Sequence, residues 1–246
     1  GGGANLSSLK FFSDVVGLKK KIFFKSSGFT LAEVLITLGI IGLVAALTMP
    51  ALIANHNKKV VEARLQKFYS AINQAIIRAE VDYGPREFWF EDNNDLALKK
   101  AWINKYIVPY MNVVKTGILI VGGAPSYTLY FSDGSAAAIA FSNGRDWFFF
   151  PKDPENCVSS AKSRDYKYFA GRCAFAFYYN PVRKSDGSYY QYYFEPYMSG
   201  WDKTEDSLKN HSTYGCNDTS SWPAYCTRWI EYNGWKNPDD YPFRVK

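Results

Sequence analysis

One carboxylate, Glu33, lies inside a long apolar run that extends from Phe29 to Met49. A helix over this run would be about 30 Å long, the thickness of a bilayer core. A carboxylate inside a membrane-spanning helix costs about 2.5–3.5 kcal/mol on insertion scales, so it indicates function by default. The chemistry open to Glu33 is pairing with a cation, which offsets that cost. The alternative is a carboxylate that reaches the near interface, since Glu33 lies about one helical turn inside.

The other side chains that could do chemistry form no recognisable site. His56 and His211 are far apart, which argues against a zinc site or a catalytic triad, and Gly122-Gly123 is a turn and not a phosphate loop. Acidic residues in the C-terminal part either bind calcium or form solvated loops, and their spacing matches no compact calcium motif: Asp202, Glu205, Asp206, Asp218, Asp239 and Asp240. We therefore predict no enzyme activity, no metal and no cofactor.

All the cysteines lie beyond residue 150, and their spacing matches no CxxC zinc pattern: Cys157, Cys173, Cys216 and Cys226. Cysteines in an exported domain form disulfides, and these four allow three pairings. Local pairing, Cys157 with Cys173 and Cys216 with Cys226, is the one we expect.

The basic stretch before Gly28 and the apolar run after it have three interpretations. A cleaved secretory signal has an apolar region of about 7–15 residues, and this run is longer. A plain signal anchor fits the length, and the positive-inside rule then places the N-terminus in the cytoplasm, but it leaves Glu33 unexplained. The third interpretation uses Glu33 and the residues around it: Gly28-Phe29-Thr30-Leu31-Ala32-Glu33.

This segment resembles the N-terminus of type IV pilins and of type II secretion pseudopilins, with one departure, Ala32, where a larger aliphatic residue or proline is usual. The resemblance implies that a prepilin peptidase cuts between Gly28 and Phe29 and methylates the new amine of Phe29. Glu33 of a neighbouring subunit would then pair with that amine and set the register between helices. Pro50 lies where such helices often carry a proline, and it predicts a kink because proline removes a backbone hydrogen bond.

The same resemblance implies the partners and the location. The partners would be other pilin-like subunits, the peptidase/methyltransferase, the membrane, and an assembly platform with its ATPase. The chain would cross the inner or cytoplasmic membrane once and export its C-terminal part. The net charge of +6 does not indicate specific nucleic-acid binding, because most of the excess lies in the leader: Lys10, Lys19, Lys20, Lys21 and Lys25 against Asp14.

Past Pro50 the apolar pattern becomes periodic, with steps of three and four that predict one buried stripe of a helix: Val61, Leu65, Phe68, Ile72, Ile76 and Ala79. Gly84-Pro85 should end this helix near Tyr83. Asn94 or Asp95 would cap a second helix through Tyr106, with Leu98, Trp102 and Tyr106 on one face.

The rest of the pattern predicts strands and then a long loop. Strands are expected at Gly117–Val121, Tyr127–Phe131, Ala136–Phe141 and Asp146–Phe150, as an antiparallel meander. Cys173–Tyr179 and Ser188–Phe194 would form a further hairpin around Ser185-Asp186-Gly187. From Tyr197 onward we expect a loop stapled by Cys216–Cys226 and anchored by Trp201, Trp222, Trp229 and Trp235. Aromatic residues make up 18% of the chain, and we interpret them as a β-rich core in preference to an exposed sugar- or partner-binding surface.

The fold class is therefore α+β: a long N-terminal helix, half in the membrane and half amphipathic, on an antiparallel meander with a disulfide-bearing C-terminal loop region. The domains would be a leader at 1–28, the helix at 29–83 (membrane 29–49, amphipathic 50–83) and an exported domain at 84–246. The function that fits is a pilin-like subunit of a type II secretion pseudopilus or related filament. A minor type IV or competence pilin for adhesion or DNA uptake is one alternative. A membrane-anchored binding domain that never polymerises is another.

Overall fold

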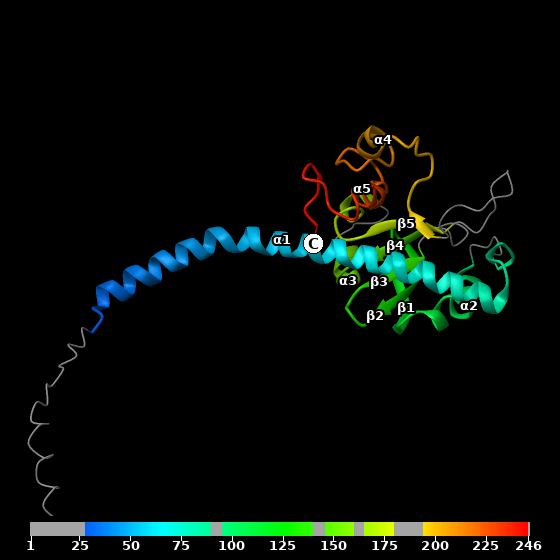
Figure 1. Cartoon of the computed structure of the whole chain (residues 1–246), viewed down its shortest axis with the longest axis horizontal. Coiled ribbons are helices and arrows are strands. Elements are labelled where there is room, and N and C mark those ends of the chain that lie inside the picture. Colours follow the sequence, from blue (N-terminus) through cyan, green and yellow to red (C-terminus); the bar gives the residue numbers. More distant parts are fainter. Residues whose placement is uncertain (1–27, 90–94, 140–145, 160–164, 180–193, 246) are drawn as a thin grey trace, which may run out of the picture. The chain divides into compact units, whose positions relative to one another are not determined.

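The computed structural model describes residues 28–89, 95–139, 146–159, 165–179 and 194–245. They fall into two compact units that divide between Thr48 and Met49, inside the long helix α1 (Leu31–Tyr83). Over its described residues, the first unit is the helix start and the apolar segment of α1. The second unit holds the rest of α1, a six-stranded sheet and several short helices (Figure 1).

The amphipathic half of α1 buries the stripe that the sequence predicts. All six predicted positions are buried, and so is Ala75. The helix ends at Tyr83, and Gly84 follows with a φ of +76°, a left-handed conformation that favours glycine and terminates helices. The Gly84 carbonyl accepts a hydrogen bond from the indole of Trp89 at 2.9 Å. This bond ties the turn η1 (Arg86–Phe88) to the helix end.

The sheet is an antiparallel meander whose spatial order follows the chain, as predicted. Its strands are β1 (Val113–Val121), β2 (Ala124–Phe131), β3 (Ala136–Ile139), β4 (Asp146–Phe150), β5 (Phe175–Tyr179) and β6 (Phe194–Pro196). β1 and β2 both begin several residues earlier than the sequence suggests. The end of the predicted strand Ala136–Phe141, the predicted turn at Ser185-Asp186-Gly187 and most of the predicted strand Ser188–Phe194 lie outside the described residues.

The sheet is buried on both faces, which explains why its central strands are continuously apolar. Trp147 and Phe149 of β4 contribute to the core under α1, whereas Phe148 and Phe150 contribute to a second core under the C-terminal region. Phe68 of α1 stacks on Phe149 with ring centroids 4.3 Å apart. The aromatic residues therefore build two cores, one on each side of the sheet.

The helix α2 (Leu96–Tyr106) starts at Asp95, whose carboxylate accepts hydrogen bonds from the N–H groups of Ala97 (2.6 Å) and Leu98 (3.2 Å). The buried residue of α2 is Ile103, and the Leu98 side chain is 44% exposed. Of the three residues predicted to share one face, Trp102 and Tyr106 pack against the core beside Ile103, whereas Leu98 does not. The turn η2 (Val108–Tyr110) connects α2 to β1.

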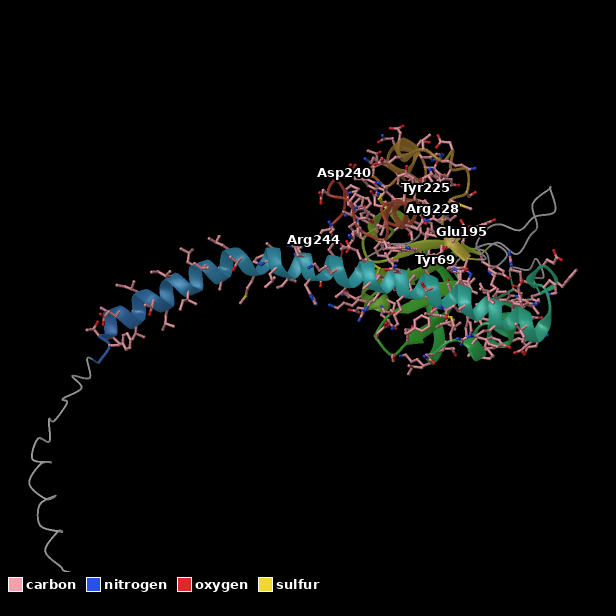
Figure 2. All side chains as sticks on the ribbon, in the orientation of Figure 1. Tyr69, Glu195, Tyr225, Arg228, Asp240 and Arg244 are labelled. Atoms are coloured by element: carbon pink, nitrogen blue, oxygen red, sulfur yellow. A yellow bond between two sulfur atoms is a disulfide. The ribbon has the colours of Figure 1, made fainter. Side chains whose placement is uncertain are left out.

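The C-terminal region contains more helix than the loop that the sequence predicts. It holds α4 (Glu205–Asn210) and α5 (Cys226–Tyr232), and two further short elements precede it, α3 (Pro154–Ser159) and η4 (Tyr166–Tyr168). Of the four tryptophans expected to anchor it, Trp229 is buried and the others are half-buried. The guanidinium of Arg228 on α5 joins the Glu195 carboxylate on β6 at 2.6 Å and thereby fixes α5 to the sheet (Figure 2).

Candidate functional site

The start of α1 brings Thr30 and Glu33 together. The Thr30 hydroxyl accepts a hydrogen bond from the Glu33 N–H at 3.2 Å. In return, one Glu33 carboxylate oxygen accepts hydrogen bonds from the Thr30 N–H and the Thr30 hydroxyl, both at 2.8 Å. This reciprocal arrangement is a capping box, which satisfies donors that every helix start leaves without an intrahelical partner.

Thr30 thus caps α1, a role that was not predicted from the sequence. Its signal is the Thr-x-x-Glu spacing directly before an apolar run, which is the sequence signature of a capping box. Glu33 was assigned from the sequence to an ion pair with a neighbouring chain, and that assignment stays a prediction. Within its own chain, the same carboxylate fixes where the helix begins.

Gly28 and Phe29 precede the helix, and the Phe29 side chain is 88% exposed. The apolar side chains that follow, up to Met49, are also exposed, and this part of α1 is long and apolar enough to cross a membrane. Thr37 and Thr48 donate their hydroxyls to the carbonyls of Val34 (3.0 Å) and Val44 (2.9 Å) in the preceding turn. Because these hydroxyls are satisfied inside the helix, the segment presents an apolar surface suited to lipid or to other helices.

Pro50 lies inside α1, and the helix continues on both sides of it. The two disulfides are Cys157–Cys173 and Cys216–Cys226, which is the local pairing expected from the sequence. The first ties α3 to the chain before β5. The second ties the segment after α4 to the first residue of α5.

Several acidic residues of the C-terminal part form local contacts. Lys209 on α4 bridges Glu205 (2.9 Å) and Asp240 (2.8 Å), and the Asp202 carboxylate accepts hydrogen bonds from Thr204. Over the described ranges, no cluster of three or more histidine, cysteine or acidic side chains is placed to hold a metal ion. His56 is exposed on α1.

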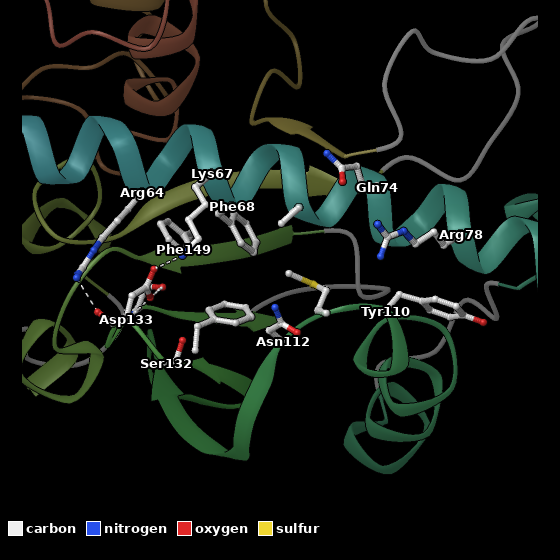
Figure 3. A pocket seen from close by; sticks show the side chains of 14 residues that line it. Arg64, Lys67, Phe68, Gln74, Arg78, Tyr110, Asn112, Ser132, Asp133 and Phe149 are labelled. Atoms are coloured by element: carbon white, nitrogen blue, oxygen red, sulfur yellow. Dashed lines mark hydrogen bonds and ion pairs between the residues drawn. The ribbon is translucent and has the colours of Figure 1, made fainter.

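A cavity of about 300 Å³ lies between α1 and the turn that joins β2 to β3 (Figure 3). Two basic residues that line the cavity, Arg64 and Lys67, bind Asp133 of that turn. Arg64 donates to the carbonyls of Asp133 (2.6 Å) and Pro151, and Lys67 forms an ion pair with the Asp133 carboxylate at 2.9 Å. Burial raises the pKa of Asp133, but hydrogen bonds from Ser135 and Lys67 outweigh it and lower the pKa to about 2. The arrangement clamps the hairpin onto α1.

Comparison with known families assigns both parts of the chain. Residues 24–49 match the model of the prokaryotic N-terminal methylation motif, and residues 51–245 match the model of a family of unknown function, DUF6613. Neither the curated proteins nor the solved structures gave a significant match. Proteins with the methylation motif are structural subunits, and the motif together with the apolar helix is consistent with a single-pass anchor in the inner membrane. The chain therefore belongs to the family DUF6613 and is a type IV pilin-like protein with a prepilin-type N-terminus.

Proposed function

We propose that this protein is a structural subunit of a type II secretion pseudopilus or a related filament. Its leader, residues 1–28, is cytoplasmic and is removed by a prepilin peptidase, which cuts after Gly28 and methylates Phe29. Residues 29–49 then anchor the chain in the membrane, residues 50–83 form the amphipathic half of the helix, and residues 84–246 complete the exported domain. The observation that carries the proposal is the match to the methylation motif over residues 24–49, which includes the exposed apolar start of α1.

Assembly follows from the exposed apolar surface of α1. In a membrane this surface is covered by lipid, and on leaving the membrane it must be covered by neighbouring helices. Glu33 sets the register between neighbouring helices. Its carboxylate can form an ion pair with the methylated amine of a neighbouring subunit, and this specific contact offsets the cost of a charge in the membrane. An assembly platform and its ATPase provide the work of extraction.

Mass spectrometry of the mature N-terminus, on protein from native membranes, tests the processing step. We expect a chain that begins at N-methyl-Phe29. A chain that still carries residues before Gly28 would contradict the proposal and favour a static, membrane-anchored binding domain. Once processing is established, purified filaments that contain the protein alongside secretion components, or alongside pilus components, would separate the pseudopilus from a minor type IV or competence pilin.

A further inference from the structure

The two edge strands of the sheet, β1 and β6, differ in whether their outward backbone groups have hydrogen-bond partners. β6 is a short edge whose outward groups are occupied by side chains. The Asn73 carboxamide accepts from the Phe194 N–H at 3.0 Å and donates to the Phe194 carbonyl at 2.9 Å. Pro196 has no N–H, and its carbonyl accepts from Arg228 at 3.3 Å. Side-chain caps and proline are the means by which sheets close an edge against further pairing.

The other edge, β1, is long and open. It spans Val113–Val121 and pairs with β2 through a two-residue turn at Gly122 and Gly123, both with positive φ. In such a hairpin the residues flanking the turn form a hydrogen-bonded pair, and bonded and non-bonded pairs then alternate along the strands. The backbone groups of Thr116, Ile118 and Ile120 consequently point away from β2. Among the described residues, none hydrogen-bonds with these groups.

The side chains of the same edge form an exposed apolar stripe. Ile118 and Ile120 are 50% and 55% exposed, and Val114, at the register shift between Val113 and Lys115, is 66% exposed. Natural proteins avoid leaving a long, apolar edge strand uncovered, because it is a template for another strand. One kind of ligand would both cover the stripe and pair with the outward backbone groups: an extended chain with apolar residues at alternate positions.

Two lysines give this edge a positive rim, one on each face of the sheet. The Lys100 ammonium lies 5.9 Å from the ring centroid of Tyr127, the residue paired with Ile118. The Lys115 ammonium lies 4.6 Å from the ring centroid of Tyr130. Neither lysine forms an ion pair within the part of the chain that the structure describes. Acidic residues at the ends of an incoming strand would complement this rim.

We propose that β1 is a β-augmentation site for an extended apolar strand with acidic ends, supplied by a different polypeptide. A second copy is the less suitable occupant. Antiparallel pairing of β1 with its own copy requires a two-fold axis perpendicular to the sheet, and this would reverse the α1 segment that packs along the sheet. Chains anchored in one membrane with the same topology run in the same direction. The β6 edge of a second copy is closed by Asn73.

The test uses full-length protein in detergent and a fluorescent synthetic peptide of nine residues that alternates valine with threonine and carries glutamate at both ends. We expect saturable binding, measured by anisotropy. At saturation, the amides of Thr116, Ile118 and Ile120 should exchange with deuterium at least about tenfold more slowly. A peptide with N-methylated alternate amides should not bind, because it cannot form the ladder.

The variant Ile118→Pro removes one outward N–H without breaking the pairing to β2, because Ile118 and Tyr127 form a non-bonded pair. It should abolish binding, and Ile118→Lys serves the same purpose if the proline variant does not fold. Val81→Lys, at an 82% exposed apolar position on α1, is the matched control and should bind normally.

Absence of saturable binding, or binding that persists in both Ile118 variants, would overturn the proposal. So would a homodimer that Ile118→Pro dissociates. Neither processing after Gly28 nor filament assembly affects this assay, so its outcome is independent of theirs.

Discussion

Gly171 lies against the Cys216–Cys226 disulfide so closely that a Cβ atom at this position would come within 2.5 Å of the Cys226 sulfur. Its φ of +72° is also one that side-chain-bearing residues rarely adopt. Gly171→Ala therefore combines a left-handed backbone penalty of about 1–2 kcal/mol with overpacking of about 1–3 kcal/mol. We expect a loss of about 2–5 kcal/mol in the free energy of unfolding, measured in denaturant with the disulfides intact.

Gly134 provides the control for this prediction. It has a similar φ, +79°, but a Cβ there would meet nothing within 4 Å. Gly134→Ala should lose only the backbone part, about 1–2 kcal/mol. Equal losses in the two variants would show that the disulfide can move away from residue 171.

Asn73→Ala should destabilise the second unit, because it leaves the N–H and carbonyl of the buried Phe194 without their partner. Buried groups that lose a hydrogen-bond partner cost about 1–3 kcal/mol. The adjacent Gln74 is exposed on the same helix, so Gln74→Ala should change stability by less than about 0.5 kcal/mol. Denaturant unfolding of both variants tests the difference, and a neutral Asn73→Ala would contradict it.

Asp133 gives the protein an acid-sensitive clamp. Its pKa is about 2 in the folded state, against an ordinary value of 3.8, so its contribution is complete above pH 3.8 and is lost as the pH falls through 2. Because the side chain is partly exposed, we expect a contribution of only about 1 kcal/mol. The stability difference between the native protein and Asp133→Asn should shrink over this interval. A difference that is constant with pH would exclude an electrostatic origin.

Two variants separate the roles of Glu33. Glu33→Gln keeps the hydrogen-bonding shape of a capping box but removes the charge, whereas Thr30→Val removes the cap and keeps the charge. If the charge sets the register, Glu33→Gln should reduce filament yield at least about tenfold and Thr30→Val should assemble. Electron microscopy with quantitative blotting of sheared filaments measures this. The reverse ranking would mean that the helix start, and not the ion pair, matters for assembly.

The predictions from the sequence agree best with the structure where a single physical rule determines the residue pattern. The stripe from Val61 to Ala79 was predictable because α1 buries one face only. A cap at Asn94 or Asp95 was predictable because capping depends on local geometry, and the structure places it at Asp95. The order of the strands followed from turn residues. The motif around Gly28 and Phe29 was readable because a sharp change from basic to apolar residues marks a membrane boundary.

The features that were missed depend on tertiary contacts. α3, α4 and α5 have six or seven residues, too few to show a helical period, and α5 is buried on several sides so that its pattern is not amphipathic. The first residues of β1 were missed because an exposed edge strand does not alternate between buried and exposed positions. The closure of β6 by Asn73 joins residues 121 positions apart, and no local pattern reports such a contact.

The hydrogen bonds between Thr30 and Glu33 also mark where α1 stops on its N-terminal side. The first helical residue is Leu31, so the Gly28–Phe29 peptide bond remains in non-helical chain. Enzymes and receptors that recognise polypeptide backbone bind it in extended form, with its N–H and carbonyl groups free to pair, whereas a helix already uses those groups internally. If a prepilin peptidase cuts between Gly28 and Phe29 as proposed, the Thr30 and Glu33 side chains keep that bond outside the helix. Helix capping, as well as the glycine, would then determine the cleavage position.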